Sequence, residues 1–160
     1  MKDGLNALYE RRSVRKYKSE QISDGELEQI LKAGLCAPSA MNRQPAIIIA
    51  VQDKDTIAYM SKLNAQVMGA NGDPFYGAPT VLVVLAEADN ANAVKDGSLV
   101  LGNLINAASA LGIGSCWVNR AQEVFASAEG KALLEKWGVQ GDYIGVGNCI
   151  LGYPAETPAA

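Results

Sequence analysis

The sequence contains no histidine at any of its 160 positions. This absence excludes Ser–His–Asp and Cys–His nucleophilic triads, because both need an imidazole as the general base. It also removes the commonest side-chain ligand of transition-metal sites. A chain without these groups either carries out no chemistry or takes its chemistry from a bound cofactor.

Cysteine is scarce as well. Cys36, Cys116 and Cys149 lie far apart in the sequence, and no Cys-x-x-Cys pair is present. This spacing favours buried, reduced thiols over a disulfide framework or a zinc site.

Long apolar runs and an excess of positive charge are also missing. No stretch is long and apolar enough to span a bilayer, and the N-terminal sequence MKDGLNALYERR lacks the apolar run and the cleavage site of a signal peptide. The net charge of −3 and the pI of about 5.0 argue against a general nucleic-acid or membrane-surface binder. Together these features predict a cytoplasmic protein.

Apolar residues make up 49% of the sequence, which is enough to build the core of one domain over residues 1–160. Continuous β-prone runs predict buried strands, and amphipathic periodicity predicts helices, one of them starting at a Ser23–Glu26 capping box. We expect strands at 46–52, 80–88 and 143–152, and helices near 5–11, 24–37, 55–67, 94–111 and 124–137. This order indicates an α+β fold with a central sheet.

The expected helix at 94–111 has little polar face, which is typical of a central, buried helix. In so short a chain, a second subunit would be needed to cover part of such a helix. The sequence therefore predicts an oligomer.

The segment Arg11–Arg15 is the first candidate binding site. Three guanidinium groups and the Ser13 hydroxyl lie within five residues of an otherwise acidic chain. Guanidinium forks match phosphate oxygens in geometry and charge, so the segment favours a phosphate ligand. The alternative is a solvated helix end, where cations oppose the negative pole of the helix dipole.

Two further segments carry polar groups beside predicted core elements. Pro38–Pro45 holds a Ser, an Asn and a Gln, whose donors and acceptors suit the polar edge of a heterocycle; the alternative is an ordinary turn before a strand. Gly112–Arg120 follows the buried helix, and its glycines allow close backbone approach to a ligand; the alternative is a helix end and a core Trp.

Two glycine motifs do not match a nucleotide-binding fingerprint. The third glycine of the dinucleotide pattern is replaced by Ile150 in GVGNCI and by Trp117 in GIGSCW, and neither motif carries the Lys of a P-loop. These motifs therefore argue against a Rossmann NAD-binding protein and against a P-loop NTPase.

Taken in order, five segments resemble the FMN-dependent nitroreductase family. They are LYERRSVRKY, ILKAGLCAPSAMNRQP, DPFYGAPTVLVV, DGSLVLGNLINAASALGIGSCWV and LGYPAE. They cover almost the whole chain, and the combination of Arg-Arg-Ser-x-Arg with Pro-Ser-x-x-Asn-x-Gln-Pro is the most specific part. The resemblance implies an α+β fold with a central mixed sheet flanked by helices, in a homodimer with two FMN sites at the interface.

The resemblance also implies a role for particular residues. The FMN phosphate and the polar edge of the ring would be held by Arg11, Arg12, Ser13 and Arg15. The flavin of the other subunit would be reached by Pro38, Ser39, Ala40, Met41 and Asn42, with Gln44 supporting that loop. The isoalloxazine would lie against Trp117, Val118 and Asn119, with a backbone amide near flavin N5, and its pyrimidine edge would contact Asn64.

The implied activity is ping-pong transfer of electrons from NAD(P)H through FMN to a nitroaromatic, a quinone or a similar small-molecule acceptor. The family pattern and this chain differ after Lys136, where no cation follows, and at Asn119-Arg120, where many members have an acidic residue and a glycine. Arg120 could therefore attract an anionic acceptor or the phosphate of NADPH, or it could be an ordinary surface arginine. Two alternatives remain: a flavin- or phospholigand-binding protein without efficient turnover, and a structural partner protein whose arginines only end a helix.

Overall fold

The computed structural model describes residues 3–159. Its centre is a four-stranded sheet in the order β1-β2-β4-β3, made of β1 (Ala46–Val51), β2 (Thr80–Glu87), β3 (Gly114–Val118) and β4 (Tyr143–Gly152). All neighbouring strands are antiparallel. The expected mixed sheet is therefore wrong in this detail, because β4 inserts between β2 and β3, which run in the same direction. A parallel contact remains at the isolated bridge between Ser13 and Ser115.

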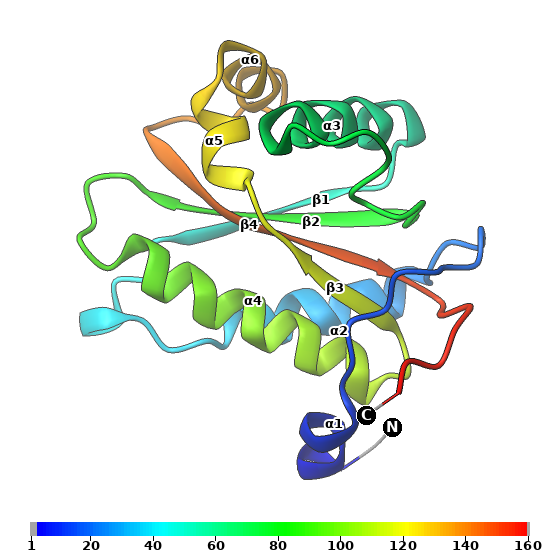
Figure 1. Ribbon diagram of the computed structural model, residues 1–160. Coiled ribbons are helices and arrows are strands. Elements are labelled where there is room, and N and C mark those ends of the chain that lie inside the picture. The colour runs from blue at the N-terminus through cyan, green and yellow to red at the C-terminus, as the bar shows by residue number, and fades with distance from the viewer. Residues whose placement is uncertain (1–2, 160) are drawn as a thin grey trace.

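Helices cover both faces of this sheet (Figure 1). One face packs against α2 (Asp24–Leu35) and α4 (Ala93–Ala110), and the other packs against α3 (Lys54–Met68), α5 (Ala121–Ala126) and α6 (Ala128–Lys136). The central strand β2 is accordingly buried along its length up to Ala86, as its continuous apolar run predicts. Alternate β2 residues enter the two separate apolar cores.

Local sequence signals explain most helix ends. The predicted capping box at the start of α2 is confirmed, since Ser23 accepts from the Glu26 amide and the Glu26 carboxylate accepts from the Ser23 amide. Asp53 caps α3 in the same manner, through the Thr56 amide at 2.8 Å.

The helix expected at 124–137 is two helices instead. The chain breaks at Ser127, whose hydroxyl accepts from the Gly130 amide at 3.0 Å and so starts α6. Gly130 lies directly against the backbone of Val124 and Phe125, a close approach that a side chain would prevent.

The short helix α1 (Gly4–Glu10) packs on the C-terminal end of α4, where the Ser109 hydroxyl donates to the Ala7 carbonyl at 2.9 Å. Its large apolar side chains Leu5, Leu8 and Tyr9 are exposed in the single chain. Such exposure on a helix end is compatible with the predicted oligomer, which stays a prediction here.

Two of the three thiols are buried as expected. Cys116 and Cys149 lie in the core, where burial raises the pKa of the Cys149 thiol, whereas Cys36 is exposed just after α2. Among the described residues, no helix is both long and apolar enough to cross a membrane.

A candidate cofactor site at the edge of the sheet

The arginine-rich segment lies beside the edge strand β3. Ser13 forms a bridge with Ser115, and the Val14 amide donates to the Ser115 carbonyl at 2.9 Å. The Tyr17 hydroxyl donates to the Val14 carbonyl at 2.5 Å, and burial raises the pKa of this phenol, so it remains a neutral donor. These contacts fix the backbone that carries the three arginines.

The three arginines differ in what they contact. Arg12 donates to the carbonyls of Tyr9 and Arg11, at 2.9 and 2.8 Å, and so satisfies the C-terminal end of α1. The helix-end interpretation is therefore right for Arg12. By contrast, the Arg15 guanidinium lies 6.0 Å from the centre of the Tyr76 ring, and neither Arg11 nor Arg15 pairs with a carboxylate within residues 3–159. Within residues 3–159, Arg11 and Arg15 are therefore the two arginines of this segment whose guanidinium groups make no hydrogen bond or ion pair.

The end of β3 offers backbone groups and the ring of Trp117 as possible contacts for a ligand. Trp117 is 38% exposed, and its indole lies over Gly147, where an added Cβ would come within 2.6 Å of the indole nitrogen. The Val118 side chain is turned into the core, so only its backbone is left for a ligand, and Asn119 is exposed. Because β3 is the last strand of the sheet, no further strand pairs with its outer edge in the described chain beyond the Ser13 bridge.

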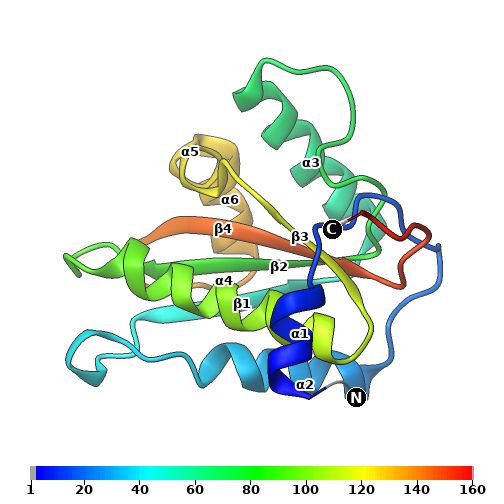
Figure 2. The same cartoon turned by 60° about the horizontal axis from the view of Figure 1, so that its bottom comes forward.

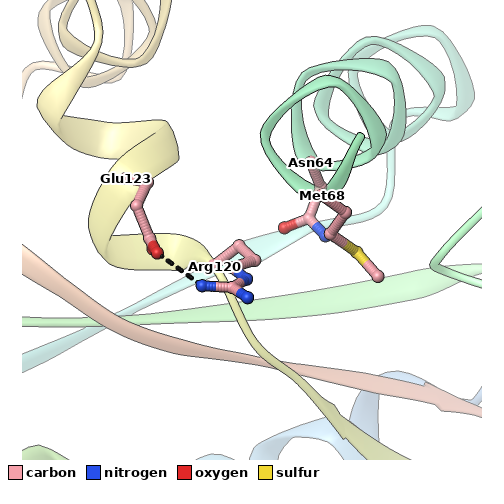
Figure 3. A network of polar contacts seen from close by, with 4 residues as sticks. All are labelled: Asn64, Met68, Arg120 and Glu123. Atoms are coloured by element: carbon pink, nitrogen blue, oxygen red, sulfur yellow. Dashed lines mark hydrogen bonds and ion pairs between the residues drawn. The ribbon is translucent and has the colours of Figure 1, made fainter. Parts of the chain in front are cut away.

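Asn64 contributes a buried polar group from α3. The residue is 1% exposed, its amide nitrogen donates to the Met68 sulfur at 3.4 Å, and its carbonyl oxygen has no hydrogen-bond partner among residues 3–159. Figure 3 shows this oxygen turned to the side of Arg120, the residue directly before α5, and α3 and α5 are in contact. A buried acceptor without a donor is costly, so this atom is a natural contact for a ligand N–H.

Arg120 itself is held at the turn between β3 and α5. Its Nη1 donates to the Glu123 carboxylate at 2.9 Å, and this hydrogen bond lowers the pKa of the Glu123 carboxyl. Both side chains are about half exposed, so the pair adds little to stability.

The second predicted segment, 38–45, forms a strained loop before β1. It contains a single 3-10 turn, Ala40–Asn42, and Met41, Asn42 and Gln44 all have positive φ angles, between 50° and 55°. The Gln44 amide donates to the Ser39 hydroxyl at 2.9 Å, which confirms that Gln44 and Ser39 belong to one folded loop. Met41, at its tip, is 85% exposed.

Asp96 anchors this loop to α4, and the sequence analysis missed it. Its Oδ1 accepts from the Ala40 amide at 3.1 Å, while its Oδ2 is buried without a partner in the described part of the chain. The side chain lines a cavity of about 280 Å³ together with Pro38, Ser39 and Gln44. A carboxylate inside an otherwise apolar helix pattern was the available signal.

We predict that Asp96→Ala loosens the loop. The Ala40 amide would lose a charged acceptor, a loss of about 1.5 kcal/mol or more, and the positive-φ residues would relax. Limited trypsin cleavage after Arg43 should then become about ten times faster. Asp96→Asn keeps an acceptor oxygen and should be cleaved at nearly the wild-type rate; equal rates for Ala and wild type would contradict the anchoring role.

The two predicted halves of the site lie at opposite ends of α4 (Figures 1 and 2). Asp96 holds the 38–45 loop near the start of the helix, and Ser109 holds α1 near its end. These two residues are 13 positions apart, which corresponds to about 20 Å of helix. In one chain the arginine segment runs beside β3, and Asn64 lies on the side of Arg120 at the end of that strand, whereas the 38–45 loop lies at the other end of α4.

A further cavity lies away from these residues. It measures about 680 Å³ and lies between α3 and the segment 70–79, and none of the site residues predicted from the sequence lines it. Its carboxylate, Asp73, is already engaged by the Ser61 hydroxyl and by the amides of Phe75 and Gly77. This carboxylate stabilises a turn, so the cavity has no free acidic group for chemistry.

Comparison with known proteins identifies the family of this chain. Residues 8–153 match the model of the Nitroreductase family. A protein of Archaeoglobus fulgidus with the provisional description NADH dehydrogenase/NAD(P)H nitroreductase is 35% identical over 162 residues, covering 98% of this chain and 88% of its own. The FMN reductase [NAD(P)H] of Bacillus subtilis is 25% identical over 182 residues, covering 99% and 69% of the two chains.

Solved structures show the same fold. A nitroreductase with bound FMN from Bacteroides fragilis superposes with a TM-score of 0.86 at 30% identity, covering 100% of this chain and 92% of the other. A nitroreductase with bound FMN from Desulfitobacterium hafniense gives a TM-score of 0.87 at 28% identity, covering 99% and 92%. The match along nearly the whole chain, in sequence and in fold, means that this protein belongs to the nitroreductase family.

Proposed function

We propose that this protein is an FMN-dependent oxidoreductase that passes electrons from NAD(P)H to a small acceptor such as a quinone or a nitroaromatic. One observation carries the proposal. The segment that carries Arg11 and Arg15 runs beside the outer edge of β3, and the unpartnered, buried Asn64 oxygen lies on the side of Arg120, which follows that strand.

The residues at this edge fit FMN in the chemistry that they offer. Arg11 and Arg15, with the Ser13 hydroxyl, supply the charge-assisted donors that a phosphate dianion needs. The Asn64 oxygen, which has no donor in the described chain, can accept from a ring N–H of the flavin. The backbone of Trp117–Asn119 can lie against the ring, and Trp117 is kept in place by its contact with Gly147.

When bound, FMN accepts a hydride from the nicotinamide and passes electrons on to the acceptor. The protein's own residues then have three tasks: to bind the cofactor, to orient it and to leave one face open to substrates. None of these tasks requires a protein nucleophile or an imidazole, which is consistent with a chain that has no histidine.

We further propose that the protein acts as a homodimer, each chain folding as one domain. The 38–45 loop lies about 20 Å along α4 from the arginine segment, so it cannot complete the site of its own chain. A second copy would bring Pro38, Ser39, Ala40, Met41 and Asn42 to the flavin, and the exposed Met41 is suited to that contact.

A visible absorption spectrum of the purified protein is the first test, followed by chromatography of the ligand released by heat. We expect a yellow protein that releases FMN, is reduced by NADH or NADPH without oxygen, and has the mass of a dimer by light scattering. A protein that holds FMN but is reduced only very slowly by both donors would support the alternative, a flavin-binding protein without useful turnover. A colourless protein that takes up no added FMN would refute both.

A further inference from the structure

The backbone at Arg120 is unusual for an arginine. Its φ angle is 78° and its ψ angle is 10°, a left-handed conformation in which glycine is unstrained and a side chain is disfavoured. The turn between β3 and α5 would therefore be easier to form with glycine. An arginine at this strained position points to a use for its side chain that the turn itself does not need.

The position of the guanidinium suggests what that use is. Residues 117–119, directly before Arg120, form the strand end that would face the proposed flavin. In the view of Figure 3, Asn64 and Glu123 lie on opposite sides of Arg120. A molecule stacked on the flavin would therefore be bordered by Arg120. Of the five N–H donors of the guanidinium, only one on Nη1 has a hydrogen-bond partner within residues 3–159, the Glu123 carboxylate.

In the Arg120–Glu123 pair, the Glu123 carboxylate can be replaced by an anion of a ligand. It is a single contact between side chains that are 48% and 46% exposed, so a ligand anion can replace Glu123 at little cost. A carboxylate or a phosphate on the ligand would gain two parallel hydrogen bonds from the planar fork, which Glu123 does not make here.

We propose that Arg120 is a specificity-determining residue that binds an anionic group of the substrate lying on the flavin. This inference rests on the proposed function. The anionic group has two chemical sources: a carboxylate on an aromatic acceptor, or the additional phosphate that distinguishes NADPH from NADH.

Two substrates of similar shape, one anionic and one neutral, test whether Arg120 recognises the negative charge of the substrate. 4-Nitrobenzoate and 4-nitrobenzamide carry the same ring and the same nitro group, and their other substituents are of similar size, a charged carboxylate in one and a neutral amide in the other. We expect Arg120→Gly, which fits the φ angle without strain, to lower the ratio of kcat/KM for the benzoate over the benzamide by about tenfold. Lys32→Ala removes a different exposed ion pair, the one between Lys32 and Glu28 on α2, and should leave this ratio unchanged.

Glu123→Gln distinguishes ligand binding from a structural role. If Glu123 competes with the substrate anion, its neutralisation should raise the same ratio about two- to threefold, opposite in sign to Arg120→Gly. If the pair only stabilises the start of α5, both variants should change in the same direction, and that result overturns the proposal.

Two further measurements identify the source of the anion. Unreactive benzoate, compared with benzamide, should perturb the absorption spectrum of the FMN-loaded protein more strongly in wild type than in Arg120→Gly. The rate of flavin reduction by NADPH relative to NADH, followed without acceptor, reports the phosphate. A smaller benzoate effect in Arg120→Gly would support the proposal and identify the anion as a carboxylate. A smaller preference for NADPH would support it and identify the anion as the phosphate. If the kcat/KM ratio, the spectral effect and the NADPH preference are all unchanged, the proposal is overturned.

A wild-type protein that binds no FMN refutes the proposed function and this inference together. An active enzyme in which these three quantities are unchanged refutes only the inference.

Discussion

Replacing Arg11, Arg12 and Arg15 together by Ala should strip FMN from the protein while the fold survives. The phosphate of FMN would lose several charge-assisted hydrogen bonds, each worth roughly 1.5–3 kcal/mol. Two such losses alone correspond to an increase in the dissociation constant of about a hundredfold or more. Titration of the apo-protein with FMN, followed by quenching of flavin fluorescence, measures this constant directly.

The contacts of the three side chains predict which single variants lower stability and which weaken FMN binding. Arg12 donates to two backbone carbonyls at the end of α1, so Arg12→Ala should mainly lower the free energy of unfolding, by about 1 kcal/mol. Arg11 and Arg15 make no ion pair within residues 3–159, so their removal should mainly weaken FMN binding. Thermal unfolding of the apo-proteins separates the two effects.

A charge-matched control guards against a general electrostatic effect. Lys16→Ala, Lys18→Ala and Lys32→Ala together remove the same number of positive charges from exposed positions. This variant should keep its FMN affinity within a few-fold of wild type. Full FMN content in the triple arginine variant would show that the segment is only a helix end and that the phosphate is bound elsewhere.

The parts of the fold that could be predicted from the sequence are those set by local patterns. Residues 80–86 of β2 are buried on both faces because each of them is apolar or β-branched, and a strand with that pattern is stable only when both of its faces are covered. The capping box at Ser23 was equally predictable, since it needs only two side chains three residues apart.

The features that the sequence did not predict depend on distant contacts. The antiparallel order follows from β4 pairing between two earlier strands, which no local pattern specifies. Asp96 acts on a loop 56 residues away, and the direction of the Arg12 side chain depends on where α1 ends. The separation of the 38–45 loop from the arginine segment also depends on distant contacts. It becomes visible only when the two segments are seen packed at opposite ends of α4.

Gly145→Ala is expected to lower the stability of the fold strongly. Gly145 lies on β4, where a Cβ atom would overlap the Ala121 carbonyl group and come within 2.9 Å of the Gln122 amide nitrogen. All of these atoms are backbone at the start of α5, so no side chain can move aside, and the helix itself must shift. We expect a loss of about 3 kcal/mol in the free energy of unfolding, measured by urea denaturation.

The same substitution should also disturb the candidate site, because α5 begins directly after Asn119 and Arg120. A helix pushed away from β4 carries that turn with it, so FMN should bind more weakly in the molecules that remain folded. Gly25→Ala is the matched control: nothing lies within 4 Å of its added Cβ, and an Ala in this helix should raise stability by about 0.5 kcal/mol. If Gly145→Ala proves as stable as this control, then the close contact between β4 and α5 does not hold the turn in place. The position of Arg120 would in that case have to be fixed by its contact with Glu123.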